Sequence, residues 1–589
     1  MFLPITKKEI DQRGWDYVDV IIVSGDAYVD HPGFGHAVIA RTLEAQGYRV
    51  AILAQPNWRD DLRDFKKLGK PRLFFGISSG CMDSMVNHYT ASKRLRSDDA
   101  YTPGAEAGFR PDYATTIYSQ ILKEIYPDTP VIIGGIEASM RRNVHYDYWS
   151  ESLKPSILID SKADMLVYGM GERTIVEIAN RLNNGESISE INDIYQTGFI
   201  SKTKEIKGPL ENIPTIELPS FEECLEDKFN QARSIKIIEN TSNKIIGERL
   251  IQKHSEKYVI INPFDPNFST KDLDNSYELP YERAPHPKYI KRGAIPAFEM
   301  IKHSVNIHRG CFGGCAFCTI VAHQGKQIIS RTEGSILKEV EIISKMNDFK
   351  GYLSDLGGPS ANMYKMQGKD LSLCQKCSKA SCIYPVICPN LNYNHKPLLD
   401  LYSKVRSLPY IKKAFIGSGV RYDMFIPSLL SKDKKDNNHC KEYFETLFEH
   451  HVSGRLKVAP EHTEDSVLKQ MRKPSFSQFV ELKKWFDSLN KKYNLKQQLI
   501  PYFISSHPSC TTKDMQLLAQ KTKELGYRLE QVQDFTPTPM TIATETYYTG
   551  YDIISLNPKA KNSEAKKIYS AKTKEDKQKQ NAAFFWWKK

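Results

Sequence analysis

Three cysteines lie close together in the stretch HRGCFGGCAFCTI, at Cys311, Cys315 and Cys318. Their CxxxCxxC spacing supplies three thiolates, one fewer than a closed tetrahedral zinc site needs, unless His308 or His323 completes the set. An iron–sulfur cube has four irons, so three thiolates leave one iron free to bind substrate or cofactor. Spacing alone leaves both metals open.

Glycines and an aromatic residue in the same loop favour the larger cofactor. Gly310, Gly313 and Gly314 allow the backbone to wrap closely around a bulky group. Phe317, directly before the last cysteine, would shield a cluster from water and so help to set its potential.

A second group of cysteines occurs in CQKCSKASCIYPVIC, at Cys374, Cys377, Cys382 and Cys388. Four thiolates this close in sequence can form a tetrahedral zinc site or hold an auxiliary iron–sulfur cluster. Four cysteines without a metal on a polar loop would be chemically exposed, which argues against a metal-free role. The sequence therefore predicts a metal here and leaves zinc and iron–sulfur both open.

Alternating strands and helices must position these cysteines. From residue 303 onward, amphipathic helices separate strand candidates at 303–308, 350–358, 412–420, 454–462, 496–506 and 528–537. Six such units make most of a (β/α)8 barrel, so we expect a partial (β/α)6 TIM-type barrel over 296–545, with a cysteine-rich insertion at 370–390. Sites in these barrels lie at the carboxyl ends of the strands, and the first cysteines follow the first strand.

The N-terminal part shows the same α/β rhythm. Apolar runs at 18–26, 49–56, 72–80, 130–139 and 164–172 alternate with amphipathic helices, which predicts a Rossmann-like parallel sheet domain over 1–185. Residues 186–295 have weaker periodicity and many prolines, so we expect a connector with irregular and β structure. Residues 546–589 are polar and rich in lysine, which predicts a disordered tail.

Composition limits the class of protein. The chain has 589 residues, of which 40% are hydrophobic and 26% charged, values typical of a globular protein with two to four domains. No run of 18 uncharged apolar residues occurs and the N-terminus lacks a signal peptide, so we expect a cytoplasmic protein with no membrane contact. The net charge of +12 comes largely from lysine-rich stretches such as 431–441 and 561–580, which favours solvated surface over a nucleic-acid footprint.

The pattern CxxxCxΦC, with Φ aromatic, after the first strand of a βα barrel resembles the defining motif of radical S-adenosylmethionine (SAM) enzymes. The resemblance implies that Cys311, Cys315 and Cys318 hold a 4Fe-4S cluster and that the amine and carboxylate of SAM chelate the open iron. It further implies reductive cleavage of SAM to methionine and a 5′-deoxyadenosyl radical, with a reductant such as flavodoxin or ferredoxin as partner.

Further positions resemble the motifs of this superfamily that bind SAM. Gly357 and Gly358 in DLGGP are similar to the GGE motif that meets the methionine amine, although proline replaces the glutamate. Ser418 and Arg421 in GSGVRYD fall where the superfamily contacts ribose or carboxylate, and VAPEH (458–462) falls where it contacts adenine. A tight turn would also account for the two glycines, and a structural ion pair for the arginine.

A closer resemblance covers nearly the whole chain. The stretches GDAYVDHPGFG, GGIEASMRR, DLGGPSANMY and VAPEHTEDSVLKQMRKP are similar to the YgiQ family of radical SAM proteins. The N-terminal domain of that group resembles cobalamin-binding domains. The cobalt-ligating DxHxxG loop is absent here because Asp30 and His31 are adjacent, which argues against cobalamin but leaves binding without a histidine ligand open.

Two functions of different class follow from these patterns. The first is a radical SAM enzyme whose substrate is unknown, with RNA, a protein or a small molecule all open, and whose catalytic residues are unknown. Glu461 and His462 are candidates for acid–base work, and SVLKQMRKP resembles methylthiotransferases that act on RNA. The alternative is a non-catalytic, zinc-stabilised RNA-binding protein.

Overall fold

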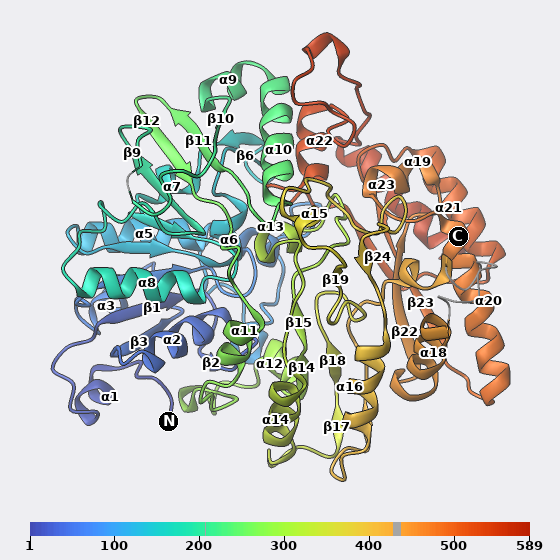
Figure 1. The fold of residues 1–589 in the computed structure, drawn as a ribbon, viewed down its shortest axis with the longest axis horizontal. Helices are drawn as coiled ribbons and strands as arrows, with labels where there is room; N and C mark the ends of the chain where they lie inside the picture. Colours follow the sequence, from blue (N-terminus) through green and yellow to red (C-terminus); the bar gives the residue numbers. More distant parts are fainter. Residues whose placement is uncertain (207, 428–437, 589) are drawn as a thin grey trace. The chain divides into compact units, whose positions relative to one another are not determined.

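The computed structural model describes residues 1–206, 208–427 and 438–588 (Figure 1). The chain forms two compact units: residues 1–242, 246–302 and 538–540 make the first, and residues 243–245, 303–537 and 541–589 make the second. Most of the lysine-rich stretch 431–441 lies outside the described residues.

A nine-stranded sheet forms the centre of the first unit, in the order β10-β11-β12-β9-β8-β5-β4-β1-β3. Five strands are parallel neighbours: β3 (Val50–Ala54), β1 (Val20–Ser24), β4 (Phe74–Ser78), β5 (Val131–Ile133) and β8 (Met165–Val167). The helices α2 (Gly35–Ala45) and α5 (Ala114–Ile125) lie between them in sequence, and α8 (Glu172–Asn183) follows β8. The strands are almost wholly buried, as parallel strands covered on both faces must be, so the expected Rossmann-like parallel sheet is present.

Residues 186–295, predicted as a connector with irregular and β structure, extend this sheet. They contribute β9 (Thr197–Ser201), β10 (Thr215–Leu218), β11 (Arg249–His254) and β12 (Lys257–Ile261). β8 with β9, β9 with β12, and β12 with β11 pair antiparallel, while β10 pairs parallel with β11. Antiparallel strands need no crossover helix, which explains why the strand–helix rhythm fades after residue 185.

Shorter elements complete the first unit. The pair β2 (Val29–Asp30) and β13 (Ala284–Pro285) is antiparallel, as is the pair β6 (His145–Asp147) and β7 (Ser152–Lys154). The other helices are α1 (Lys7–Gln12), α3 (Arg63–Lys66), α4 (Ser84–His88), α6 (Gly135–Met140), α7 (Ile157–Ser161), α9 (Phe221–Glu226), α10 (Lys228–Ser242), α11 (Thr270–Tyr277) and α12 (Pro296–Ile301).

Parallel strands also organise the second unit, in two sets. β14 (Ser304–Asn306) pairs with β18 (Asp355–Gly357), and β17 (Tyr352–Leu353) pairs with β21 (Lys413–Ala414). β23 (Gln498–Ser505) lies between β22 (Arg455–Glu461) and β24 (Gln531–Asp534). The N–H of Ile416 donates to the carbonyl of His451 and Nδ1 of His451 contacts the carbonyl of Ala414, which links the two sets, but the described residues form no ladder between β21 and β22.

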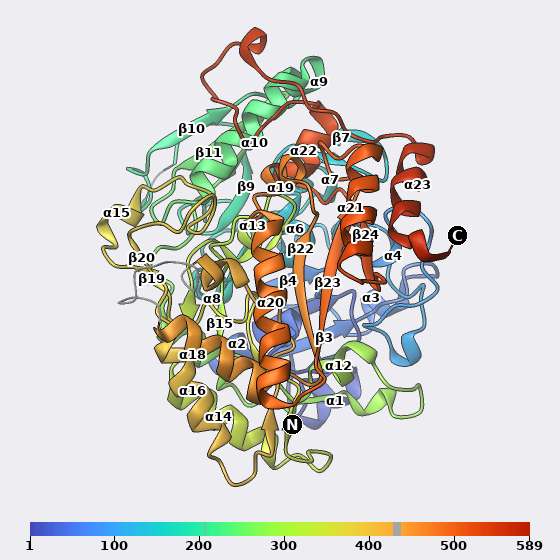
Figure 2. The same cartoon turned by 90° about the vertical axis from the view of Figure 1, so that its right-hand side faces the viewer.

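Helices alternate with these strands, as six βα units require. They are α14 (Glu333–Ser344), α16 (Lys396–Arg406), α18 (Asn438–Thr446), α19 (Asp465–Met471), α20 (Phe476–Tyr493) and α21 (Thr512–Glu524) (Figure 2). Two antiparallel pairs interrupt the alternation: β15 (His308–Arg309) with β16 (Ile329–Ser330), and β19 (Gln367–Gly368) with β20 (Leu391–Asn392). The short helices α13 (Ile320–Gln324) and α15 (Ser372–Gln375) lie within the loops that these pairs close.

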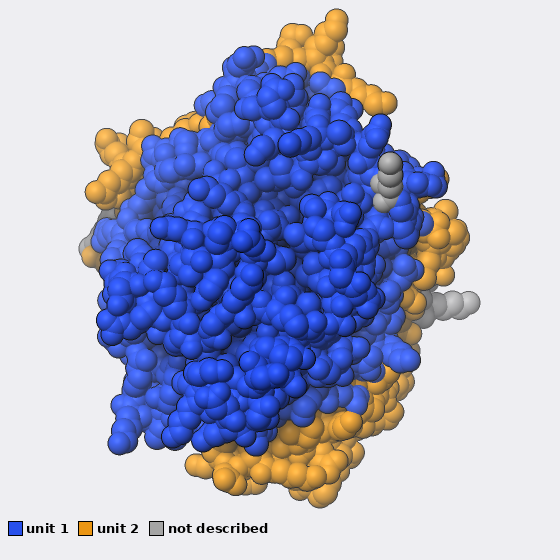
Figure 3. All heavy atoms as spheres, turned by 90° about the vertical axis from the view of Figure 1, so that its left-hand side faces the viewer, with its two compact units in different colours: residues 1–242, 246–302, 538–540 blue, residues 243–245, 303–537, 541–589 orange. Residues whose placement is uncertain are grey.

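The C-terminal segment is ordered, whereas the sequence predicted disorder. Residues 541–588 belong to the second unit (Figure 3) and include α22 (Ile542–Thr549) and α23 (Lys574–Ala582). The side chain of Gln580 donates to the carbonyl of Cys510 at 2.9 Å and accepts from the N–H of Ser506 at 2.9 Å. Phe584 is fully buried, so a few apolar and amide anchors hold a segment that is polar on average.

The described helices also bear on membrane contact. None of them combines the length and the apolar content that crossing a bilayer requires.

Candidate functional site

The cysteine loop at 311–318 begins directly after β15 and is closed at its base by the pairing of β15 with β16. Two glycines permit this closure. A Cβ atom on Gly310, whose φ is +85°, would lie 1.9 Å from the carbonyl oxygen of Gln327. A Cβ atom on Gly314, whose φ is +65°, would lie 2.3 Å from the carbonyl oxygen of Ala380. Both glycines therefore allow close backbone approach within the protein.

The SVLKQMRKP stretch holds the other side of this loop. The N–H of Ala316 donates to the carbonyl of Met471 at 3.1 Å, and Nη1 of Arg472 donates to the carbonyl of Gly314 at 3.3 Å. Arg472 and Lys473 are each 6% exposed. These basic side chains point into the protein, so they do not form an RNA-binding surface.

The three thiols are buried or half-buried and are not spaced for zinc. Burial raises the pKa of Cys311, and the nearby Arg421 opposes this rise. Burial also raises the pKa of Cys318, to about 12, and the neighbouring thiols of Cys315 and Cys311 contribute to that rise. A tetrahedral zinc ion with bonds of ~2.3 Å would hold sulfurs ~3.8 Å apart. Among the described residues, only His395, His439 and Cys440 form a group of three whose ligand atoms all lie within 4.8 Å of one another. The cysteine loop is thus too open for zinc.

Arg421 contacts both this loop and a carboxylate. Its Nη1 donates to Sγ of Cys315 at 3.4 Å, while Nε and Nη2 bind the carboxylate of Asp423 at 2.9 and 2.6 Å. A Cβ atom on Gly313 would lie 2.3 Å from Nη1 of Arg421, so only glycine leaves space for the guanidinium. The structural ion pair weighed from the sequence is present, and the arginine also faces a thiol of the cysteine loop.

The other positions matched to SAM-binding motifs lie at the ends of β18 and β21. The hydroxyl of Ser418 donates to the carboxylate of Asp355, whose Oδ1 also accepts from the N–H of Gly417 at 2.8 Å. A Cβ atom on Gly357 would lie 2.4 Å from Oγ of Ser418, and one on Gly358 would lie 2.5 Å from Cε1 of His308. The two glycines are required by close packing at the strand end.

Two residues of the PSANMY stretch were not singled out from the sequence. Oγ of Ser360 lies 3.5 Å from Sγ of Cys311. Oδ1 of Asn362 accepts from the N–H of Arg421 at 2.9 Å, and its Nδ2 donates to the carbonyl of the same residue at 3.1 Å. Asn362 therefore fixes the backbone from which Arg421 reaches the cysteine loop. The available signal was an amide three residues after the GGP turn.

Buried polar atoms without a partner among the described residues surround the loop. They are both ring nitrogens of His308, the hydroxyl of Tyr422, Oε2 of Glu461 and Nε2 of His507. Burial lowers the pKa of His308 to about 3 and that of His507 to about 4, and burial raises the pKa of Glu461 against the opposing Lys473. Unpaired buried polar groups are costly, so this donor and acceptor set fits a polar ligand beside the thiols.

Phe317 lies at the same place. Its ring is edge-on to that of His507, with centroids 6.0 Å apart. His507 was not singled out from the sequence, because nothing in its own neighbourhood connects it to a cysteine loop so far away in the chain.

Three other residues considered from the sequence, His462, Asp30 and His31, are engaged in structural contacts. Nδ1 of His462 accepts from the N–H of Glu464 at 3.1 Å, and its Nε2 lies 3.5 Å from Sγ of Cys510. Asp30 forms a buried ion pair with Arg41, and Nδ1 of His31 accepts from the N–H of Gly33 at 3.0 Å. His462 therefore has no free nitrogen for acid–base work.

Buried ion pairs lie at the carboxyl edge of the first unit's sheet, where a Rossmann-like domain would hold a ligand. Arg141 pairs with Asp83, and Arg110 contacts Asp99 at 3.0 Å. The side chain of Glu137 accepts from the N–H of Thr115 at 2.9 Å. His31, the histidine nearest to the expected cobalt-ligating position, is also engaged, through Gly33 and Arg283.

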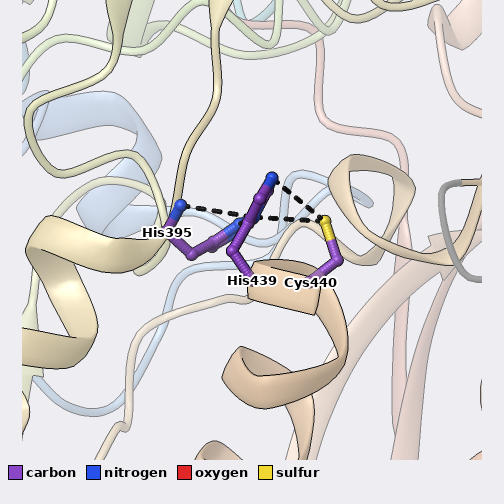
Figure 4. Close-up of side chains that lie close together, drawn as sticks. All are labelled: His395, His439 and Cys440. Carbon is purple, nitrogen blue, oxygen red and sulfur yellow. Dashed lines mark hydrogen bonds between the residues drawn. The ribbon is translucent and has the colours of Figure 1, made fainter. Parts of the chain in front are cut away.

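His395, His439 and Cys440 converge beside the second unit's strand ends (Figure 4). Nδ1 of His395 lies 3.2 Å from Nδ1 of His439, which lies 3.4 Å from Sγ of Cys440. The amide of Asn362 donates to Nε2 of His395 at 3.4 Å, which leaves the proton of that ring on Nδ1. Hydrogen bonds thus account for the contacts of His395, and a metal ion would have to displace that proton.

The second cysteine group lies in the loop that β19 and β20 close, as the predicted insertion requires. All four cysteines are free thiols. Cys382 donates its N–H to the carbonyl of Phe312 at 3.0 Å, so this loop packs directly on the first cysteine loop.

Comparison with known proteins identifies the family of the chain. The model of a protein family described as "Radical SAM N-terminal" matches residues 2–304. A UPF0313 protein of Porphyromonas gingivalis is 57% identical over 588 residues, covering 100% of this chain and 90% of the relative. The UPF0313 protein YgiQ of Escherichia coli K12 is 46% identical over 611 residues, covering 95% of this chain and 80% of the relative.

Solved structures give a weaker likeness. The radical SAM methyltransferase TsrM of Kitasatospora setae, solved with tryptophan and a SAM analogue, has a TM-score of 0.46 and 13% identity. The likeness covers 88% of this chain and 74% of TsrM. A second TsrM structure, with cobalamin and a [4Fe-4S] cluster, has a TM-score of 0.47 and 14% identity, covering 89% and 74% of the two chains.

The family match defines an enzyme of the radical SAM class, whose members use a 4Fe-4S cluster and SAM and need a reductant. More narrowly, the chain belongs to the UPF0313 family, which includes YgiQ. The resemblance inferred from the sequence motifs is confirmed, and the enzyme is favoured over a non-catalytic RNA-binding protein.

Proposed function

We propose that Cys311, Cys315 and Cys318 hold the 4Fe-4S cluster and that SAM binds at the iron they leave open. The spacing of the three thiols carries this proposal, because they share one buried loop yet are too far apart for a single zinc ion. When bound, such a cluster would supply the electron for reductive cleavage of the C5′–S bond of SAM, which yields methionine and a 5′-deoxyadenosyl radical able to take a hydrogen atom from a substrate.

The protein's own residues hold, orient and shield this chemistry. Arg421 places a positive charge beside Cys315, where it balances thiolate charge. His308, Tyr422 and Glu461 offer the unpaired polar atoms that a zwitterionic, ribose-bearing ligand needs. Phe317 and His507 cover the loop and keep water from a reactive radical.

Of the substrate classes considered, RNA loses its main sequence support. Arg472 and Lys473 are buried, and Lys473 lies 3.6 Å from the carboxylate of Glu461. A protein side chain or a small molecule therefore remains as the substrate class. A cytoplasmic flavodoxin or ferredoxin is the reductant we propose.

The test is anaerobic. The full chain is reconstituted with iron and sulfide, reduced with dithionite and given SAM, and 5′-deoxyadenosine is then measured. We expect product from the wild type, none from Cys315→Ala, and wild-type levels from Cys224→Ala, which removes a buried thiol of the first unit.

Binding is measured separately because some enzymes cleave SAM only with substrate present. SAM should change the electron paramagnetic resonance (EPR) spectrum of the reduced wild-type cluster. A cluster-loaded wild type that neither cleaves SAM nor changes its spectrum would contradict the proposal.

A further inference from the structure

The second cysteine group is held in a closed loop of the protein. Gly368 and Gln367 pair with Leu391 and Asn392, which pins residues 369–390 at their base. The N–H of Lys369 adds a hydrogen bond to the carbonyl of Asn390 at 2.6 Å. The loop is therefore a defined structure rather than a free tail.

Hydrogen bonds gather the four cysteines near the base of this loop. The N–H of Cys388 donates to the carbonyl of Cys382 at 2.8 Å, and that of Cys377 to the carbonyl of Cys374 at 3.2 Å. Sγ of Cys374 accepts from the side-chain amide of Asn390 at 3.4 Å, and the carbonyl of Cys388 accepts from the N–H of Leu391 at 2.8 Å. Cys374 and Cys388 therefore both lie beside the paired strands that close the loop, each next to its hydrogen-bonded cysteine partner.

Neither a disulfide nor zinc suits this neighbourhood. All four cysteines are free, and no three of their sulfurs lie within 4.8 Å of one another. Zinc bound by thiolates at ~2.3 Å would need sulfurs ~3.8 Å apart. A larger, polynuclear centre fits the wider spacing.

A buried lysine supplies positive charge at the same place. Lys326 is 5% exposed, and its Nζ donates to the carbonyl of Lys379 at 2.5 Å. No carboxylate among the described residues forms an ion pair with it, and the carbonyl that it contacts lies between Cys377 and Cys382 in the second loop. An unpaired buried ammonium is costly, and thiolates bound to a metal would provide the missing negative charge.

This loop also contacts the first cysteine loop. The carbonyl of Phe312 accepts from the N–H of Cys382 at 3.0 Å and from the hydroxyl of Ser381 at 3.3 Å. Cys311 and Ile383 belong to one buried apolar cluster, against which Cys388 packs. A redox centre in the second loop would therefore adjoin the first.

We propose that Cys374, Cys377, Cys382 and Cys388 bind a second iron–sulfur cluster, with Lys326 balancing its charge. Four protein thiolates leave no iron open, so this cluster suits one-electron transfer rather than substrate binding. The proposal goes beyond radical cleavage of SAM and does not depend on it, because metal content alone tests it.

The main test uses the triple variant Cys311→Ala/Cys315→Ala/Cys318→Ala, reconstituted anaerobically and desalted. We expect it to keep iron and sulfide in a one-to-one ratio, at about half the wild-type load if both clusters are cubes. The double variant Cys382→Ala/Cys388→Ala should lose the other half and still show the SAM-sensitive EPR signal. Cys224→Ala should keep the full load.

A folded triple variant with zinc and no sulfide, or with no metal, would overturn the proposal. Folding is checked by circular dichroism and size-exclusion chromatography. Either result would leave SAM cleavage by the wild type unaffected, so this proposal and the radical chemistry fail in distinguishable ways.

Lys326→Met provides a test that leaves all cysteines in place. Loss of a buried positive charge should shift the reduction potential of the cluster that SAM does not perturb to a lower value. The exposed Lys376→Met is the matched control, since solvent screens its charge and the potential should not move. Equal potentials in wild type and Lys326→Met would contradict the role of the lysine.

Discussion

Arg421 and Cys315, which are 106 positions apart in the chain, are joined by a hydrogen bond of 3.4 Å from Nη1 to Sγ. The same guanidinium binds Asp423 through its other two donors. The arginine therefore carries a positive charge to the cysteine loop while its own charge is balanced inside the protein.

Replacing Arg421 should make the first cluster harder to reduce. A nearby positive charge stabilises the added electron, so Arg421→Gln should lower the potential of the SAM-sensitive EPR signal. Loss of one charge-assisted hydrogen bond, worth ~1.5–3 kcal/mol, should slow SAM cleavage by roughly 10- to 100-fold. A redox titration and the 5′-deoxyadenosine assay measure the two effects.

Asp423 becomes unpaired in that variant, so a control is needed. Breaking a buried ion pair from one side costs about 3–5 kcal/mol. The double variant Arg421→Gln/Asp423→Asn should recover stability and show a smaller fall in potential. An unchanged potential in the single variant would show that the arginine has no electrostatic role.

Asn362 should matter through the backbone of Arg421. Asn362→Leu removes two hydrogen bonds to that backbone and leaves an N–H and a carbonyl buried without partners, at a cost of about 1–3 kcal/mol for each group. We expect a lower unfolding temperature and reduced iron retention after desalting. Asn347→Leu, at an exposed position, is the control. Full iron retention in Asn362→Leu would contradict this positioning role.

The cysteine loop, the strands and most helices could be predicted from sequence because their signals are local. CxxxCxxC lies within eight residues, and the buried strands β1, β3 and β4 read as short apolar runs. The disordered tail was predicted from average polarity, which missed the few anchors, Gln580 and Phe584, that fix the segment.

The partners of the site could not be predicted, because they come from distant parts of the chain. Asn362 and Arg421 are 59 positions apart, and no local pattern connects them. Lys326 meets the cysteines of the second loop only after folding. Single residues that act through long-range contacts leave no periodic signal in one sequence.

Acid should destabilise the fold as pH falls below about 6.5, the usual pKa of histidine. Burial lowers the pKa of His308, His395 and His462 to about 3 and that of His451 and His507 to about 4. The unfolded chain therefore binds more protons than the folded chain between about pH 6.5 and 4, and the stabilising effect is complete only above this window.

His451→Phe tests this linkage away from the cysteines. Nδ1 of His451 donates to the carbonyl of Ala414 at 2.6 Å. The centroids of the His451 and Tyr402 rings are 4.4 Å apart. The variant should lower the slope of unfolding free energy against pH by at most ~1.4 kcal/mol per pH unit within the window. The more exposed His450→Phe should change the slope less. Urea titrations at several pH values measure it, and identical slopes for His451→Phe and the wild type would contradict the linkage.

Phe584 should contribute strongly to the stability of the second unit, although it lies near the C-terminus. Its side chain is fully buried, so Phe584→Ala should cost about 3–5 kcal/mol. Phe585→Ala, at the half-buried neighbouring position, should cost clearly less. Thermal unfolding of the two variants makes the comparison.

Since Gln580, on the adjoining helix α23, forms a hydrogen bond with Ser506 beside His507, we also expect Phe584→Ala to lower iron retention at the cysteine loop. Equal unfolding temperatures for the two variants would mean that the C-terminal segment does not hold the strand ends in place.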